Sequence, residues 1–512
     1  MTIDRANYDK PIIHIVDEAC ERYCDRVCLQ YGEETYTYGE VQALSIQYAS
    51  ALQGAGFQQG MHAAIYSLNS AKAFVLTLAI IRAGGVWIPV NPRNSVADNI
   101  KVLNKLGCDA IFYQREFVDV IEGIKPAHGH MLVSEDIDQV EAWLDGAKQV
   151  TVCRKDDVDN IITMPMTGGT TGVPKGVMLS DLNFRALSYA MAYVMRNWKR
   201  DPVYMVAAPM THVGGRIVLA TMSTGCRFVI LDKVDPQEIL HTIEREGITD
   251  FFLPPTAIYS LLAQPNVRDF DFSSLEAITY GSAPISEVKL REAIDVFGPV
   301  MTGGFGQTEC PMMISNFPRE DHIIDGKPAE DGRLRSVGKA SVISELAILD
   351  DDANELPLGE LGEIGVKGDM VSPGYFNAPE ESAKIRKNGW HLTGDIGYLN
   401  DDGFLFIVDR KKDMIITGGF NVYSSEVENA LSSIKGVAQA AVIGVPSEHW
   451  GEEVKAFICL EEGRVLPEAD IIAQCKADIG SVKSPKSIDF VDVLPTTPLG
   501  KVDKKQLKAR YA

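Results

Sequence analysis

The chain has 512 residues and a mass of 56.1 kDa, with 46% hydrophobic and 23% charged residues. This length and composition predict a globular protein of two or more domains and argue against a disordered chain, a collagen or a coiled-coil rod. Acidic residues outnumber basic ones by 70 to 49, giving a net charge of −21, so we expect no nucleic-acid partner. The longest nearly apolar stretch, residues 73–81, is too short for a membrane span, so we also expect no membrane partner.

The termini and the cysteines together predict a cytoplasmic location. The first residues contain no apolar signal segment, and the last three are not a peroxisomal address. The nine cysteines are scattered and match no zinc-binding pattern. Dispersed cysteines without a secretory signal are typical of a reducing compartment.

Helical and strand patterns alternate through the first 280 residues. Helices are expected over residues 11–24 and 39–53, where apolar residues recur at helical spacing. This alternation predicts an α/β fold with mostly parallel sheets. The expected strands cover residues 27–30, 34–38, 63–66, 86–90, 110–113, 204–207, 227–231, 251–253 and 277–280.

The pattern changes after Val337. Short strands at 346–349, 362–366 and 404–408, separated by Gly, Pro and Asp turns, predict an antiparallel arrangement or a small barrel. From Arg410 onward basic and acidic residues are equal in number, at 14 each, so the whole negative excess lies upstream. We therefore predict two domains, residues 1–409 and 410–512. The second is expected to contain helices at 425–431 and 468–479 and strands at 439–445, 454–460 and 487–491.

The segment from Thr167 to Gly176 has the composition of a phosphate-binding loop. Its four glycines allow backbone N–H groups to approach an anion, and its three hydroxyls and one lysine add donors and charge. It is not a Walker P-loop, because Pro174 precedes the lysine and no Gly-Lys-Ser/Thr occurs. The predicted phosphate-binding residues are Thr167, Gly168, Gly169, Thr170, Thr171, Gly172 and Lys175.

Four further segments follow in order. Residues 280–284 are Tyr-Gly-Ser-Ala-Pro, 303–309 are Gly-Gly-Phe-Gly-Gln-Thr-Glu, 390–395 are Trp-His-Leu-Thr-Gly-Asp, and 495–501 are Pro-Thr-Thr-Pro-Leu-Gly-Lys. Together with the glycine loop, this series resembles the adenylate-forming enzymes, which include acyl-CoA and aryl-CoA ligases, luciferases and peptide-synthetase adenylation domains. The resemblance covers nearly the whole chain.

The resemblance implies a fold and a two-step reaction. The expected fold has a large N-terminal domain of two α/β sheets plus a small β-barrel, followed by a small mobile α/β domain. In the reaction, a carboxylate attacks the α-phosphate of ATP to give acyl-AMP and pyrophosphate. A thiol, usually that of coenzyme A, then displaces AMP.

The same resemblance implies roles for single residues toward ATP. Glu309 is expected to hold Mg²⁺, which suits a hard cation that bridges phosphate oxygens. Asp395 is expected to accept hydrogen bonds from the ribose hydroxyls, and Lys501 to offset the charge of the adenylation transition state. Phe305 stands where the family usually has tyrosine. The remaining implied nucleotide-binding residues are Gly281, Ser282, Ala283, Phe305, Gly306, Thr308 and Arg410.

Lys412 occupies the family's hinge position. Gly418 and Gly419 are expected to let the backbone approach the pantetheine arm, and Gly419 thereby serves the thiol-transfer step. Trp450 and Lys486 match positions that bind coenzyme A in some aryl-CoA ligases. The chain departs from the family at residues 420 and 484, where Phe and Ser replace the usual Glu and Arg.

The resemblance also implies an acyl site, because His212 resembles the residue that lines the family's carboxylate pocket. The implied catalytic residues are His212, Lys501 and Gly419. No acid occurs between Ala207 and Thr224, which argues against an amino-acid substrate because its ammonium group would lack a partner. An apolar, adaptable site is suggested by Met301, Met312, Met313 and Phe305.

The sequence thus predicts an ATP- and Mg²⁺-dependent ligase that joins an apolar acid to coenzyme A. Aromatic and arylpropenoic acids are favoured, and medium-chain and alicyclic acids stay open. The alternative within the family is an enzyme that loads a separate carrier protein, and a catalytically inactive nucleotide-binding regulator is the alternative outside it. A luciferase-like oxidation has no positive support. The expected partners are a small carboxylic acid, coenzyme A and, as an open option, a second copy of the chain.

Overall fold

The computed structural model describes residues 8–127, 129–167, 175–198, 201–447, 449–461, 463–496 and 502–510. The chain divides into two compact units. Unit 1 contains Met1–Leu346 and Val366–His391, and unit 2 contains Ala347–Gly365 and Leu392–Ala512. This division differs from the expected one, because residues 347–365 and 392–409 group with the C-terminal part. The boundary predicted at residue 410 stays a prediction.

The first sheet of unit 1 has nine strands among the described residues, in the order β18-β15-β14-β13-β12-β10-β11-β1-β2. Its six central strands, β14 to β1, are parallel, as the α/β pattern predicts. The strands are β1 (Val27–Tyr31), β2 (Glu34–Thr37), β10 (Val203–Val206), β11 (Arg227–Ile230), β12 (Asp250–Leu253), β13 (Ala277–Tyr280), β14 (Met301–Phe305), β15 (Ser315–Phe317) and β18 (Lys339–Ala340).

The second sheet of unit 1 runs in the order β21-β9-β7-β4-β3-β5-β6, with β8 paired to β9. Strands β7, β4, β3, β5 and β6 are parallel, and β8, β9 and β21 are antiparallel additions at one edge. The strands are β3 (His62–Tyr66), β4 (Val86–Pro89), β5 (Cys108–Tyr113), β6 (Val133–Asp136), β7 (Ile161–Thr163), β8 (Met166–Thr167), β9 (Lys175–Ser180) and β21 (Gly374–Tyr375).

The helices of unit 1 join both sheets in one apolar core. Buried residues of α3, such as Leu76, share a cluster with Ile65 of β3 and Phe228 of β11. Caps fix where the helices begin: Thr37 and Glu40 form a capping box at α2. The helices are α1 (Ile12–Arg22), α2 (Tyr38–Gly54), α3 (Ala71–Arg82), α4 (Val96–Leu106), α5 (Val140–Gly146), α6 (Asp181–Met195), α7 (Val213–Thr221), α8 (Pro236–Glu246), α9 (Pro255–Leu262), α10 (Glu287–Phe297) and α11 (Pro379–Lys384).

Unit 2 begins with short strands in the order β19-β20-β23, with β24 paired antiparallel to β23. The C-terminal sheet has the order β26-β25-β28-β27, with β29 paired to β28. The strands are β19 (Glu345–Leu349), β20 (Gly362–Lys367), β23 (Trp390–Leu399), β24 (Leu405–Arg410), β25 (Ile415–Thr417), β26 (Phe420–Val422), β27 (Val437–Ser447), β28 (Gly451–Leu460) and β29 (Ser487–Phe490).

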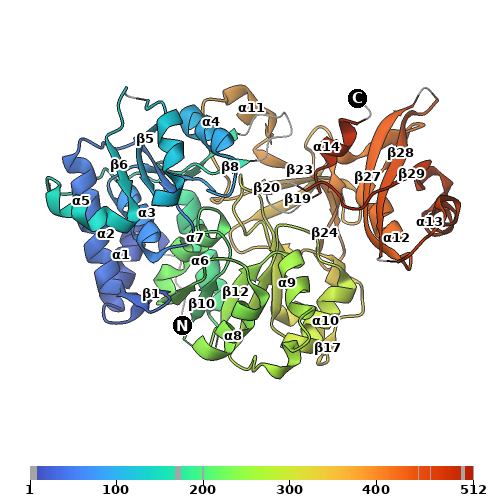
Figure 1. Ribbon diagram of the computed structural model, residues 1–512. Helices are drawn as coiled ribbons and strands as arrows, with labels where there is room; N and C mark the ends of the chain where they lie inside the picture. Colours follow the sequence, from blue (N-terminus) through green and yellow to red (C-terminus); the bar gives the residue numbers. More distant parts are fainter. Residues whose placement is uncertain are drawn as a thin grey trace. The chain divides into compact units, whose positions relative to one another are not determined.

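Helices cover both faces of this C-terminal sheet. Helices α12 (Ser424–Ser432) and α13 (Glu468–Lys483) pack on one face through Leu431 and Ile471 (Figure 1). Helix α14 (Lys504–Lys508) packs on the other face through Leu507. Strand β27 is longer than the predicted 439–445, because it pairs with β28 along almost its whole length.

The structure therefore confirms the predicted fold class, and the elements expected before residue 280 appear close to their predicted bounds. Within the described residues, no helix combines the length and apolarity that crossing a membrane would require.

Candidate active site

The two ends of the glycine loop lie side by side in unit 1. Thr167 ends β8 and pairs directly with Lys175, which begins the antiparallel strand β9. The structure thus brings these two predicted phosphate-binding residues together as partners on neighbouring strands. The other predicted residues of the loop, Gly168, Gly169, Thr170, Thr171 and Gly172, lie outside the described residues.

Lys175 takes part in a small polar network. Its Nζ donates to Oε2 of Glu381 at 2.5 Å, and it lies over the ring of Tyr375, 5.0 Å from the centroid. Hydrogen bonds from Lys175 and Lys384 lower the pKa of Glu381 to about 2, so this carboxylate is charged at neutral pH. Glu381 therefore neutralises Lys175, and an incoming phosphate would compete with it for this lysine.

Tyr375 connects the lysine to the predicted metal ligand. Its hydroxyl donates to Oε1 of Glu309 at 2.7 Å. Burial, followed by the charge of Glu309, raises the pKa of Tyr375 well above its usual value, so the phenol keeps its proton. Glu309 is half-buried, and among the described residues its other oxygen, Oε2, has no hydrogen-bond partner.

This geometry fits a magnesium ion. A half-buried carboxylate that keeps one oxygen available is a suitable protein ligand for Mg²⁺, which usually completes its shell with water and phosphate oxygens. The described residues contain no group of three or more His, Cys, Asp or Glu side chains that could hold a metal without such help. Glu309 would therefore bind Mg²⁺ together with the triphosphate, and the ion would neutralise phosphate charge there.

Two of the predicted nucleotide-binding segments meet at the carboxyl-terminal edge of the nine-stranded sheet. Strands β13 and β14 are parallel neighbours, with Tyr280 opposite Gly303, so the residues that follow each strand lie together. Ser282 adopts φ +67°. A Cβ on Gly304 would lie 2.5 Å from the carbonyl oxygen of Ser315, so a larger residue would force the strands apart. The predicted residues brought to this edge are Gly281, Ser282, Ala283, Phe305 and Gly306, and half-buried Thr308 follows them.

In unit 2, Asp395, the residue predicted to bind ribose, forms a pair with Arg410, another predicted nucleotide-binding residue. Asp395 on β23 lies opposite Arg410 on β24, and Nε of Arg410 is 2.7 Å from Oδ1 of Asp395. The aspartate is 2% exposed, whereas nearly half of the arginine side chain is exposed. The arginine therefore offsets the charge of a buried carboxylate and keeps donors directed to solvent.

The two glycines predicted near coenzyme A have different surroundings. Gly418 has φ +57°, its N–H donates to the carbonyl of Trp450 at 2.8 Å, and a Cβ there would lie 2.7 Å from the indole. Gly419 has φ +81° and nothing within 4 Å of a Cβ. The structure thus brings Gly418 and Trp450 together and leaves Gly419 beside open space. Phe420, the departure from the family pattern, is 60% exposed next to them.

Lys412 lies in a short 3₁₀ segment, Lys411–Asp413, directly after β24. Lys486 is exposed, and its Nζ donates to the carbonyl of Ser481 at 2.6 Å. Lys501 lies outside the described residues. The roles of these three residues stay predictions.

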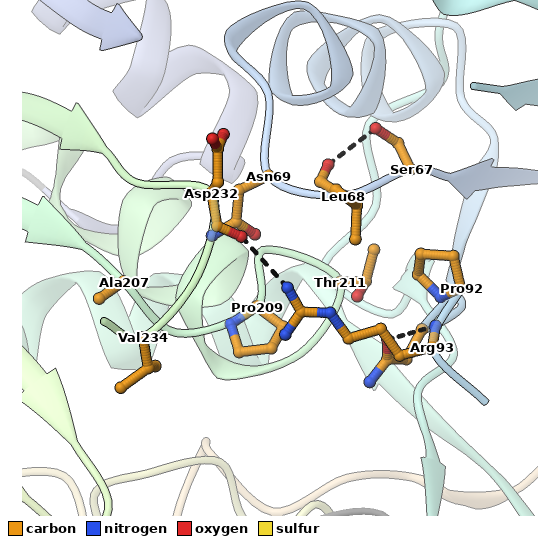
Figure 2. Close-up of a pocket in the computed structure, with 11 residues that line it drawn as sticks. Ser67, Leu68, Asn69, Pro92, Arg93, Ala207, Pro209, Thr211, Asp232 and Val234 are labelled. Atoms are coloured by element: carbon orange, nitrogen blue, oxygen red, sulfur yellow. Dashed lines mark hydrogen bonds between the residues drawn. The ribbon is translucent and has the colours of Figure 1, made fainter. Parts of the chain in front are cut away.

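His212 precedes α7 in unit 1 and is half-buried. The side chain of Asn69 fixes the loop before His212 through three hydrogen bonds. Its oxygen accepts from the backbone N–H of Met210 at 2.8 Å, and its nitrogen donates to the carbonyls of Ala208 and Leu231. Figure 2 shows Asn69 in the wall of a pocket that also includes Thr211, the residue before His212. Among the described residues, none of the predicted site residues lines this pocket.

Three side chains near the site were not predicted. Tyr375 contacts Glu309, Asn69 fixes the His212 loop, and Arg216 contacts His212. Only Arg216 left a signal in the sequence, because it is a lone charge within an apolar helical stretch that contains no acid. The other two depend on contacts between segments far apart along the chain.

This chain is similar to known proteins along most of its length. The AMP-binding enzyme family model matches residues 16–376, and the AMP-binding enzyme C-terminal domain model matches residues 426–501. The medium/long-chain-fatty-acid–CoA ligase FadD8 of Mycobacterium tuberculosis is 34% identical over 97% of this chain and 90% of its own length. Feruloyl-CoA synthase of an Amycolatopsis species is 30% identical over 94% of this chain and 95% of its own length.

Two further proteins show the range of acceptors among similar chains. The fatty acid–[acyl-carrier-protein] ligase ScoC of Streptomyces coeruleorubidus is 30% identical over 93% of this chain and 92% of its own length. The structure of the amide bond synthetase McbA from Marinactinospora thermotolerans superposes with a TM-score of 0.87 at 27% identity. It covers 98% of this chain and 100% of that one.

The fold and the site together define an enzyme that activates an acid with ATP. The chain belongs to the AMP-binding family of adenylate-forming enzymes. Within that family it is an AMP-forming acid–thiol ligase of the acyl-CoA synthetase class.

Proposed function

We propose that the protein converts an apolar carboxylic acid and ATP into an acyl-adenylate and then transfers the acyl group to coenzyme A, with Mg²⁺ held by Glu309. The observation that carries the proposal is the Glu309–Tyr375–Lys175 network. It supplies one available carboxylate oxygen for a metal and one lysine for phosphate within a single cluster. Asp395 and Arg410 would hold the ribose.

The apolar acid is supported by the packing around α7. Met313 forms a buried cluster with Leu187 and Ala190 of α6 and Ala220 of α7, and Met312 packs against it. Flexible methionines and small residues suit a hydrocarbon or an aromatic ring better than an ammonium group. Aromatic and arylpropenoic acids stay favoured in this proposal, with medium-chain and alicyclic acids as further candidates. The name of the feruloyl-CoA synthase relative agrees with the first class, and that of FadD8 with the medium-chain one.

A second candidate is an enzyme that loads a separate carrier protein, which the name of the relative ScoC supports. The decisive experiment measures pyrophosphate release from ATP with a panel of carboxylic acids, with and without coenzyme A. Formation of acyl-CoA establishes the ligase. Pyrophosphate release without acyl-CoA, combined with acylation of a carrier protein's phosphopantetheine arm, establishes the alternative. A pure, folded protein that releases no pyrophosphate with any acid would instead be the inactive nucleotide-binding regulator. A cytoplasmic location and a homodimer stay predictions.

A further inference from the structure

Arg216 is a buried cation in the first turn of α7. The residue as a whole is only 4% exposed to solvent. Its Nε donates to the carbonyl oxygen of His212 at 3.2 Å, and its Nη2 is 3.3 Å from Nδ1 of the same histidine. Both contacts go to a residue one helical turn earlier. Among the described residues, no carboxylate forms an ion pair with Arg216.

Other buried arginines of unit 1 have carboxylate partners. Arg82 is 8% exposed, and its two terminal nitrogens donate to both oxygens of Asp17 at 2.9 and 2.6 Å. The side chain of Arg154 is 7% exposed and binds Asp181 at 2.8 Å. This chain therefore normally compensates a buried guanidinium with an acid, and Arg216 is the exception in this comparison.

The surroundings of Arg216 favour the binding of an anion beside its guanidinium. A guanidinium stays protonated in proteins, and taking it out of water without a counter-charge is unfavourable. Burial lowers the pKa of Arg216 to about 10, which still leaves it charged at neutral pH. The amino end of α7 carries a partial positive charge of its own, so two positive groups lie together. An anion that enters here would compensate both.

The position of Arg216 links it to the predicted acyl site. It contacts His212, the residue that resembles the lining of the carboxylate pocket. Residues four apart share a helix face, so Arg216 shares the face of Ala220, which packs against Met313. Arg216 therefore lies on α7 between the histidine and the methionine cluster that the apolar acid is proposed to contact.

We propose that the guanidinium of Arg216 is an anion subsite that binds a carboxylate of the acid substrate. This inference rests on the proposed function. A guanidinium has five N–H donors, His212 uses two of them, and the remaining ones match the two oxygens of a carboxylate. The carboxylate is either the reacting group itself or a second carboxylate elsewhere in the acid, and the geometry beside His212 favours the reacting group.

The test compares Arg216→Met and Arg216→Lys with a matched control, Arg82→Met, which removes a buried arginine that has an internal partner. Pyrophosphate release is measured with monocarboxylic acids and with dicarboxylic acids of the same length, and each variant's Tm is measured without substrate. Arg216→Met should keep or raise the Tm, because it removes an uncompensated charge, whereas Arg82→Met should lower it. Arg216→Met should also raise KM for the acid at least about tenfold and leave KM for ATP unchanged. Arg216→Lys should give an intermediate KM.

The acid panel identifies the source of the carboxylate. An equal rise of KM for all acids assigns Arg216 to the reacting carboxylate, and a rise confined to dicarboxylic acids assigns it to a second one. An unchanged KM for both classes in Arg216→Met overturns the subsite while the wild-type enzyme still works. If Arg216→Met is unstable, an unchanged KM in Arg216→Lys overturns it equally. A wild-type protein that activates no acid would overturn the proposed function and, with it, the subsite.

Discussion

The two units hold their candidate ligand-binding carboxylates in different ways. In unit 1, Glu309 is half-buried, and one oxygen accepts a hydrogen bond from the neutral phenol of Tyr375. In unit 2, Asp395 is 2% exposed and faces the guanidinium of Arg410 at 2.7 Å. Among the described residues no cation forms an ion pair with Glu309, whereas the charge of Asp395 is compensated within the protein.

This difference separates two kinds of chemistry. A carboxylate that keeps its full charge and one available oxygen can ligate a metal ion. A carboxylate that is already paired with arginine has less charge to offer a metal and is better suited to accepting hydrogen bonds from neutral hydroxyl groups. This contrast supports the proposal that Glu309 binds the metal beside the phosphates and that Asp395 binds the ribose.

The largest effect is expected from Lys501→Ala, at the C-terminal motif. If unit 1 alone handled the phosphate charge, this change would be mild. The sequence predicts the opposite, because a cation between the acid and the α-phosphate offsets their repulsion, so adenylation should slow by about 3 kcal/mol, or on the order of a hundredfold. Thioester formation from supplied acyl-AMP should be spared. Equal slowing of both half-reactions in single-turnover assays would show that the lysine serves another role.

Glu309→Gln should have the next largest effect. The substitution keeps the volume and the hydrogen bond from Tyr375 but removes the charge that attracts a cation. We expect adenylation at low Mg²⁺ to fall by about thirtyfold, corresponding to about 2 kcal/mol, and higher Mg²⁺ to restore part of the rate. The measurement is a Mg²⁺ titration of pyrophosphate release, with Glu330→Gln, an exposed acid of the same unit, as the control. A Mg²⁺ dependence identical to the wild type would remove Glu309 from the metal site.

A smaller effect is expected for Asp395→Asn. An amide keeps one acceptor oxygen but loses the charge, and a charge-assisted hydrogen bond contributes roughly 1.5 kcal/mol more than a neutral one, so KM for ATP should rise about tenfold. With 2′-deoxy-ATP, which lacks one of the two ribose hydroxyl groups, the ratio of the variant's KM to the wild-type KM should be smaller. Asp351→Asn, an exposed acid that pairs with Lys411 in the same unit, is the control. If the substitution raises KM by the same factor for ATP and for 2′-deoxy-ATP, Asp395 does not bind the 2′-hydroxyl.

Local patterns predicted most of the fold. The parallel strands appear at their expected places because short apolar runs between turns, such as Ala277–Tyr280, suit a buried strand and are too short for a helix. The division into units was not predictable in the same way. The strands from Leu346 onward are short and separated by turns, unlike those that precede them. Which unit they join depends on strand pairing, such as that of Asp395 with Arg410, which are 15 positions apart in the sequence.

The candidate site was predicted through motifs, and the structure adds the contacts between them. Glu309 was predicted, but its partner Tyr375 lies 66 residues away and carries no local pattern that indicates a role. The same holds for Asn69, which lies 141 residues from the Met210 amide that it binds. Gly418 and Gly419 are indistinguishable in sequence, and only the position of Trp450 shows that one is packed and the other open.

The smallest effect is expected for Tyr375→Phe, which tests how Glu309 is held. Phenylalanine keeps the ring beneath Lys175 and removes only the hydroxyl that donates to Oε1 of Glu309. Without this donor the carboxylate has more rotamer freedom, so the apparent affinity for Mg²⁺ should fall about threefold, as expected for one hydrogen bond of net strength near 0.6 kcal/mol. The rate at saturating Mg²⁺ should be unchanged, because a bound metal fixes the carboxylate again. Combining Tyr375→Phe with Glu309→Gln should add little to the single Glu309 change, since the tyrosine acts through the glutamate. A Tyr375→Phe enzyme that is slow even at saturating Mg²⁺, or a double variant whose losses simply add, would show that the phenol contacts a substrate directly.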